Sequence, residues 1–329
     1  MKHRIIDVQM SDVSVLFNYP MMKLWFVTAV LSSVAALLAA GYYSDRDDSE
    51  CSNSCSSKSD VSNPFTRLDE KLDEILEYLR VNDLYCNGGV GFKPTPKPAP
   101  GPFESCKEIL EAKRADGNKA YELEIEGQKT QVYCHMTDLG SCGGGGWTMV
   151  MKMDGNKHTF TYDKALWSDK NTLNPQGGKT GFDSQETKLP TYWDTPFSKI
   201  CVGMKVGSQI KFLKIDQKAD SLHSLIADGQ HRATSLGRDA WKTLIGSDAS
   251  LQRNCNIEGF NAKGSSGRHS RARIGIAANE QNDCGSCDSR IGLGTGGYPE
   301  DSVSCGDVVR HGGDNGDKTI KALGYILVQ

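Results

Sequence analysis

The amino-acid sequence predicts an α+β protein made mainly of antiparallel sheet, with short helices, long glycine-rich loops and stabilising disulfides. Segments with strand-like alternation outnumber helical segments and do not alternate regularly with them. Glycine accounts for 35 of 329 residues and gathers toward the C-terminus. The 11 cysteines are too many for a reducing compartment, and their odd number leaves at least one free or bonded to another chain.

The N-terminal region predicts a membrane anchor. Residues 24–41 carry no charge, and this length is about the minimum that spans a bilayer as a helix. Basic residues precede the segment and acidic residues follow it, which predicts a cytoplasmic tail at 1–23, a signal-anchor at 24–41 and an extracellular C-terminus. The alternative is a cleaved signal peptide that begins at Met21 or Met22. Both interpretations place the rest of the chain outside the cell, where the ectodomain is either anchored, shed or secreted.

Composition divides the extracellular part into four segments. Residues 42–63 are rich in serine and acidic residues and predict an extended stalk. Residues 64–86 carry an apolar seam at spacings of three and four, which predicts a short coiled coil, and Cys86 continues that seam as an interchain disulfide of a homo-oligomer. The alternative is a lone amphipathic helix. Residues 91–102 predict a stiff proline-rich linker, and 103–329 predict the globular domain.

The domain begins with a short helix and a hairpin. Ser105 and Glu108 form a capping-box pattern before a helix at 106–114. Alternation over 121–136 predicts a hairpin that turns at Glu126 and Gly127. Further strands are predicted at 147–153, 199–206, 209–215, 272–278 and 324–329, and short helices at 221–229 and 238–246.

Four consecutive glycines at 143–146 raise the question of a phosphate-binding loop. Such a loop needs glycines that open a helix, so that backbone N–H groups face the anion. Here the glycines precede a strand, and no Gly-Lys-Ser/Thr follows. The pattern instead predicts a tight turn with positive φ that leads into a core strand at the buried Trp147.

Several motifs resemble known families. The stretches "SCKEI", "YELEI…QVYCHMTD" and "GGGGWTMVMKMDG" resemble the opening of a fibrinogen C-terminal-like domain, and this resemblance implies a disulfide between Cys106 and Cys134. The stretches "IGLGTGGYPEDSVSCGD" and "KTIKALGYILVQ" resemble the intelectin branch, animal lectins that hold exocyclic sugar diols on calcium. Residues 163–205 look similar to coral uncharacterized skeletal organic matrix proteins. The resemblance covers 103–329.

Residues 279–317 concentrate side-chain oxygens, which predicts either a calcium site or ordinary turns. The intelectin resemblance implies Ca²⁺ ligands at Asn279, Glu300 and Asp307. The sequence departs from that family where ligands near the sugar are expected, since it has "CGSCDSR" there. It also has "VVRHGGDNGD" in place of the aromatic pair that encloses the sugar.

The remaining cysteines of the domain are predicted to form structural disulfides whose pairing the sequence leaves open. They are Cys142, Cys201, Cys255, Cys284, Cys287 and Cys305. In a cytosolic protein, the CxxC formed by Cys284 and Cys287 would instead suggest zinc or redox chemistry. The nearby histidines are expected on the surface. The basic run that ends at Arg271 and Arg273 predicts either a contact for acidic polymers or a solvated sheet edge.

These patterns indicate a binding protein rather than an enzyme. A net charge of −3 argues against nucleic-acid binding, and the sequence contains no nucleophile elbow, HExxH motif or paired catalytic acids. We expect an extracellular, membrane-anchored or shed matrix protein of the fibrinogen-like kind, with a role in a skeletal organic matrix (biomineralisation). Its expected partners are further copies of itself and a glycan or acidic matrix polymer. The alternative is a soluble calcium-dependent lectin in recognition or defence.

Overall fold

The computed structural model describes residues 102–329. The predicted cytoplasmic tail, anchor, stalk and coiled coil, and Cys86 with them, lie outside the described residues. Between residues 102 and 329, no helix has the length and apolar character needed to cross a membrane.

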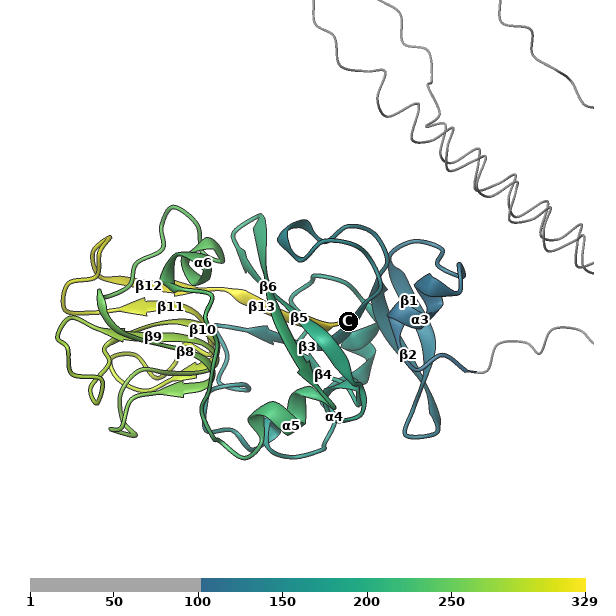
Figure 1. Ribbon diagram of the computed structural model, residues 1–329, viewed down its shortest axis with the longest axis horizontal. Coiled ribbons are helices and arrows are strands. Elements are labelled where there is room, and N and C mark those ends of the chain that lie inside the picture. Colours follow the sequence, from purple (N-terminus) through teal and green to yellow (C-terminus); the bar gives the residue numbers. More distant parts are fainter. Residues whose placement is uncertain (1–101) are drawn as a thin grey trace, which may run out of the picture. The chain divides into compact units, whose positions relative to one another are not determined.

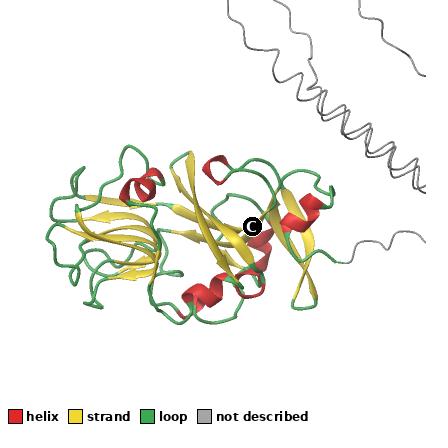
Figure 2. Ribbon diagram, in the orientation of Figure 1, coloured by secondary structure: helices red, strands yellow, loops and turns green. Residues whose placement is uncertain are grey.

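Two antiparallel sheets form the framework (Figure 1, Figure 2). The first sheet has the strand order β1-β2-β3-β13-β5-β6, and β4 pairs with β3. Its strands are β1 (Lys119–Ile125), β2 (Gln128–His135), β3 (Trp147–Asp154), β4 (Thr187–Lys188), β5 (Phe197–Val206), β6 (Gln209–Ala219) and β13 (Leu323–Val328).

The second sheet has the strand order β12-β11-β10-β9-β8-β7. Its strands are β7 (Arg232–Ala233), β8 (Asn254–Lys263), β9 (Arg271–Asn279), β10 (Ser289–Gly296), β11 (Cys305–Val309) and β12 (Lys318–Lys321). All its strand pairs are antiparallel. The predicted α+β class with mainly antiparallel sheet is therefore confirmed.

The helices are short and lie between strands. They are α3 (Cys106–Glu111), α4 (Thr191–Asp194), α5 (Leu222–Ile226) and α6 (Arg238–Thr243), with 3₁₀ turns at Gly140–Cys142, Ala165–Trp167 and Pro175–Lys179. The Ser105 hydroxyl accepts a hydrogen bond from the Glu108 N–H (3.3 Å), as expected for an N-cap. The Glu108 carboxylate reaches back to the Glu104 N–H (2.8 Å) instead of completing the predicted capping box.

The two sheets share one continuous path of backbone. Strand β12 belongs to the second sheet, and after Ala322 the chain enters β13 in the middle of the first sheet (Figure 1). One apolar core includes residues of both sheets, such as Ile276 and Ile326. A second core lies under α3 and includes Ile109 and Trp147, which are 3% and 0% exposed.

The hairpin and the glycine turn form as predicted. Strands β1 and β2 pair through Ile125 and Gln128, and the turn residues Glu126 and Gly127 both have positive φ, at 52° and 71°. In the glycine run, Gly143 and Gly146 have φ of 75° and 85°, conformations that residues other than glycine rarely adopt. The run leads directly into β3 at the fully buried Trp147.

Strand β3 is buried on both faces, whereas the sequence predicted only alternation. Lys152 is 1% exposed, and its ammonium group is held by the Asp183 carboxylate (2.5 Å) and by the Thr180 hydroxyl (3.0 Å). Burial lowers the pKa of Lys152, while the contact with Asp183 opposes that effect. The charge is tolerated in the core because it is paired and hydrogen-bonded.

Much of the glycine-rich C-terminal region, expected to consist of loops, is sheet. Glycines occur there because backbones approach closely. A Cβ on Gly275 in β9 would lie 2.7 Å from the Gly292 Cα in β10, and a Cβ on Gly294 would lie 2.5 Å from the Trp167 ring. The period-2 pattern is hidden because small residues replace the large apolar ones.

We predict that Gly145→Ala destabilises the protein strongly, by about 1–3 kcal/mol or more, because the new methyl group would overlap the carbonyl group of Met136. Backbone cannot move aside as a side chain can. Urea unfolding measures the effect.

The neighbouring Gly144→Ala is the matched control, since a Cβ at Gly144 has no atom within 4 Å. That variant should stay within about 0.5 kcal/mol of the wild type. Equal losses in the two variants would contradict the steric explanation.

Candidate functional site

Three loops that follow or precede strands of the second sheet meet at one place. They are 264–270, 280–288 and 297–304. The Ser270 N–H donates to the Cys287 carbonyl (2.8 Å), and the Tyr298 N–H donates to the Arg268 carbonyl (2.8 Å). Segments distant in sequence are thus joined through their main chains, which presents side chains from all three loops together.

A fully buried arginine is hydrogen-bonded to two of these loops, 264–270 and 297–304. Arg290 of β10 is 0% exposed, and its guanidinium donates to the Ser270 hydroxyl (3.1 Å) and the Gly297 carbonyl (3.2 Å). It also donates to the Glu300 carbonyl. Burial lowers the pKa of Arg290 to about 10, so the group stays charged at neutral pH. A cation bonded mainly to neutral oxygens is costly to bury, and it stabilises one arrangement of the loops.

An aromatic cluster lies on the surface of this region, and we call Tyr298, His269 and His311 the Tyr298 cluster. His311 comes from a fourth loop, 310–317, which is joined to the 280–288 loop by a hydrogen bond from the Arg310 N–H to the Asp288 carbonyl (3.3 Å). Tyr298 is 47% exposed and is the only exposed large hydrophobic side chain among residues 102–329. Its ring is stacked on His311, with ring centres 6.1 Å apart and planes inclined by 16°, and its hydroxyl lies 2.8 Å from His311 Nε2. The His269 ring meets it edge-on at 5.7 Å.

Unpaired polar oxygens lie in the same region. The Gln252 amide donates to the Glu280 carboxylate (2.7 Å) and to the Arg310 carbonyl (2.8 Å), while its own carbonyl oxygen is buried without a partner in the described part of the chain. Asp288 Oδ1 is likewise buried and unpartnered there. Burial, followed by the nearby Glu280, raises the pKa of Asp288. Aromatic rings beside hydrogen-bonding oxygens can bind a ligand that is apolar on one face and polar at its edges.

The predicted calcium residues have separate partners. The Asn279 amide donates to the Asp283 carbonyl (2.6 Å), and the Glu300 carboxylate accepts from the Ser302 N–H (3.1 Å). Asp307, fully buried in β11, keeps one carboxylate oxygen without a partner in residues 102–329.

Asp307 is the one of the three with a buried carboxylate oxygen that lacks a partner in residues 102–329. The described residues contain no group of three or more His, Cys, Asp or Glu side chains that could hold one metal ion. Calcium needs six to eight oxygens. Calcium binding at Asn279, Glu300 and Asp307 therefore stays a prediction.

Three disulfides brace the described residues. They are Cys106–Cys134, the pair that the resemblance implies, Cys142–Cys201 and Cys255–Cys284. The first two tie α3 and the 3₁₀ turn Gly140–Cys142 to the first sheet, and the third ties the start of β8 to the 280–288 loop.

Cys287 and Cys305 differ from the prediction of structural disulfides, because both are free and buried thiols. Cys305 pairs with Leu293 in the strand register, four residues along β10 from its first residue Ser289, and Cys287 lies two residues before that strand. At about 3.3 Å per residue this separation is far beyond the Cα distance of about 7 Å that a disulfide allows. Burial raises the pKa of Cys287 to about 11, which keeps it in the unreactive thiol form.

Within the basic run at 268–273, Arg271 and Arg273 lie in β9 between β8 and β10 and so not at a sheet edge, whereas Arg268 and His269 lie in the loop before it. Arg273 is 8% exposed and donates to the Tyr162 carbonyl (2.8 Å) and the Asn261 carbonyl oxygen (2.7 Å). Arg271 pairs with Asp163. Both guanidinium groups stack on the Tyr162 ring, at 4.3 Å for Arg273 and 5.0 Å for Arg271. The sequence pattern did not indicate that the strand of Arg271 and Arg273 is central in its sheet.

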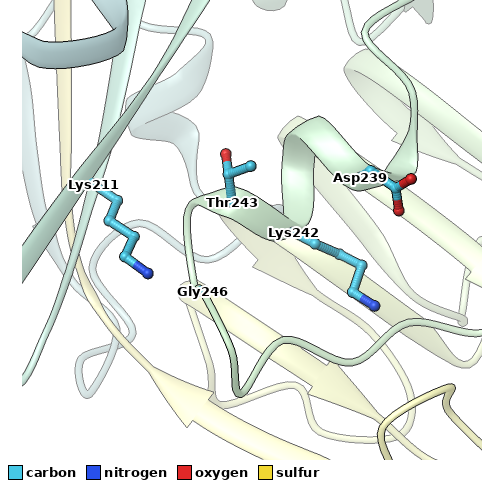
Figure 3. Close-up of a pocket in the computed structure, with 5 residues that line it drawn as sticks. All are labelled: Lys211, Asp239, Lys242, Thr243 and Gly246. Carbon is cyan, nitrogen blue, oxygen red and sulfur yellow. The ribbon is translucent and has the colours of Figure 1, made fainter.

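A separate basic cleft of about 490 Å³ lies between β6 and α6 (Figure 3). Lys211 of β6 is directed toward Gly246, and Asp239 and Lys242 stand on the helix (Figure 3). The Lys242 ammonium pairs with Asp314 (2.7 Å). Lys211 has no hydrogen-bond or ion-pair partner within the described residues, so the cleft offers one uncommitted cation.

Comparison with solved structures finds five similar chains. The fibrinogen-like globe domain of human ANGPTL2 is similar over 69% of this chain and 99% of that chain, at 16% sequence identity and a TM-score of 0.31. No protein-family model matches the chain, and no curated protein matches it. The fibrinogen-like and intelectin-like assignments therefore rest on the sequence motifs.

We predict that the unpaired Asp307 makes stability depend on pH. Burial, followed by the nearby Asp314, raises the pKa of Asp307 to about 7, against the hydrogen bond from the Ser250 N–H (2.8 Å). The folded state therefore binds this proton more tightly than the unfolded chain. The stability that Asp307 contributes is fully present below about pH 4 and is lost as pH rises through about 7, on the order of a few kcal/mol.

Asp307→Asn should flatten this dependence, since its amide keeps an acceptor for Ser250 and has no charge to bury. Urea unfolding in EDTA at intervals between pH 4 and 8 measures it. Asp248→Asn, at an exposed position, is the control and should follow the wild type. If Asp307→Asn and the wild type lose stability in parallel, the carboxyl is not buried in the charged form.

Proposed function

We propose that this protein is an extracellular, non-enzymatic binding protein whose domain at 103–329 contacts its ligand through the Tyr298 cluster, and that the ligand is a glycan. The predicted anchor and Cys86 would display several domains on one cell surface or release them together. The three disulfides support the extracellular location, because disulfides persist in oxidising compartments.

One observation carries the proposal: the only exposed large hydrophobic ring of the described residues lies against the rings of His269 and His311. Sugar rings combine an apolar C–H face with hydroxyl groups at the edge. The Tyr298 ring can pack against the apolar face, while its hydroxyl and His311 provide hydrogen bonds at the edge. Because the loops are bonded to one another through their main chains, the surface is held in place before binding, which reduces the entropic cost of association.

A second candidate function is attachment to an acidic matrix polymer, as in a skeletal organic matrix. The cleft of Lys211 and Lys242 is the surface that favours it, since an uncommitted ammonium group beside a second one attracts carboxylate or sulfate. The cleft shares no residue with the Tyr298 cluster, so variants separate the two functions.

A glycan array with the full-length protein tests both candidates. We expect binding to one class of neutral glycan, weakened about tenfold by Tyr298→Ala and largely retained in Tyr298→Phe, because the ring supplies the contact. Acidic polymers should instead lose binding in Lys211→Gln and at high salt.

Lys211→Gln is the matched control for glycan binding, as Tyr298→Ala is for polymer binding. Equal glycan binding by Tyr298→Ala and the wild type would exclude the Tyr298 cluster as the contact surface. An array on which only acidic polymers bind would favour the matrix role.

Calcium is part of this proposal through Asn279, Glu300 and Asp307. If they share an ion, bound calcium stabilises the fold by about 2.7 kcal/mol at a hundredfold excess over the dissociation constant. Thermal melting should then shift upward in millimolar calcium, less so in magnesium, whose small octahedral shell fits flexible loops poorly.

Glu300→Gln should reduce the shift, and Glu122→Gln, on the exposed face of β1, should not. If the wild type has the same melting temperature in EDTA and in calcium, the acidic loops are ordinary turns and do not bind calcium. Glycan binding that persists in EDTA would then be independent of calcium.

A further inference from the structure

A second cleft lies where α3 meets the first sheet. It has a volume of about 400 Å³, within the usual range of ligand pockets. Its lining comes from five places: 104–111 around α3, Thr148 of β3, 195–198 at the start of β5, 218–220 at the end of β6, and 328–329 at the end of β13. None of its residues belongs to the Tyr298 cluster or to the basic cleft, and we call it the Thr195 cleft.

The buried part of the Thr195 cleft is apolar except for the hydroxyls of Thr148 and Thr195. Phe197 and Val328 are 6% and 1% exposed. Thr195 is 2% exposed, and its Oγ1 is buried without a hydrogen-bond partner in residues 102–329.

Other buried threonine hydroxyls nearby are used by the fold. Thr148 Oγ1, in the same cleft, accepts from the Cys106 N–H (3.0 Å), and Thr191 donates to the Met149 carbonyl (2.8 Å). Buried polar groups are normally hydrogen-bonded, so an unpaired one beside a cavity points to a ligand. Thr195 differs from them because the fold gives its hydroxyl no partner within residues 102–329.

The rim of the cleft is acidic. Four carboxylates line it, from Glu104, Glu108, Glu111 and Asp220, against the two ammonium groups of Lys107 and Lys218. Lys107 is already paired with Glu111 (3.8 Å), within α3. A cationic group above an apolar cavity is therefore favoured over an anionic one by charge complementarity.

We propose that the Thr195 cleft binds a basic peptide segment of a partner protein. An apolar side chain of that segment fills the space beside Phe197 and Val328, and its backbone hydrogen-bonds to the Thr195 hydroxyl. A neighbouring lysine or arginine pairs with the carboxylates at the rim. The domain then has two independent binding surfaces, one on each sheet, and can link a glycan to a protein.

The test uses three synthetic peptides and the full-length protein. The probe is acetyl-Leu-Lys-Leu-amide, and the matched peptides carry acetyl-lysine or glutamate at the centre. Isothermal titration calorimetry should show binding of the lysine peptide, and binding of the other two at least about tenfold weaker, because they lack the cation that the rim attracts.

Variants locate the binding. Thr195→Val keeps the shape of the side chain and should weaken binding about fivefold by removing one hydrogen bond. Asp220→Asn, at the exposed rim, should also weaken peptide binding. Thermal melting reports whether Thr195→Val folds, and Asp220→Asn still tests the proposal if it does not. Glu122→Gln removes a carboxylate outside the cleft and should bind as the wild type does.

Equal binding of the three peptides, or no binding at millimolar concentration, would overturn the proposal. So would a loss in Glu122→Gln as large as that in Asp220→Asn. A self-association in sedimentation that Thr195→Val abolishes would assign the cleft to a second copy of the chain instead. Tyr298→Ala should leave peptide binding unchanged, so this proposal and the glycan proposal fail separately.

Discussion

The join between the two sheets is the constraint on which the rest of the domain depends. The Gly155 N–H at the end of β3 donates to the Ala322 carbonyl (2.8 Å), and the Ala322 N–H donates to the Cys305 carbonyl in β11 (3.0 Å). A side chain at Gly155 would overlap both carbonyl oxygens. One backbone therefore carries strand pairing from the second sheet into the first, and a shift there would move both sheets relative to their shared core.

Sequence patterns predicted those parts of the fold that local chemistry decides. The hairpin turn at Glu126 and Gly127, the Ser105 cap and the glycine turn before Trp147 each depend on residues within a few positions of one another. The sequence did not predict strands β8, β10, β11 and β12. In β10 the reason lies in Gly292 and Gly294. A side chain at either position would overlap a neighbouring strand or side chain, and glycine there interrupts the alternation of apolar and polar residues that predicts a strand.

The Tyr298 cluster was beyond prediction because its members come from three different loops, 264–270, 297–304 and 310–317. His269, Tyr298 and His311 are separated by 29 and 13 positions, and only the packing of the loops brings their rings within about 6 Å. The sequence did offer one signal, a tyrosine beside a proline in a glycine-rich stretch, where a large side chain has little local core to enter. The concentration of side-chain oxygens at 279–317 predicted a calcium site instead. The hydrogen bonds of Asn279 and Glu300 are also those expected of ordinary turns.

Arg290 explains how a loop region can be both ordered and open to a ligand. Loops usually order themselves by burying their own side chains, which removes those side chains from solvent. Here the guanidinium binds the carbonyl oxygens of Gly297 and Glu300, so the backbone is fixed from within the core. The side chain of Tyr298 is then not needed for the stability of its loop and stays 47% exposed. A buried charge thus orders the main chain while the aromatic ring remains free to contact another molecule.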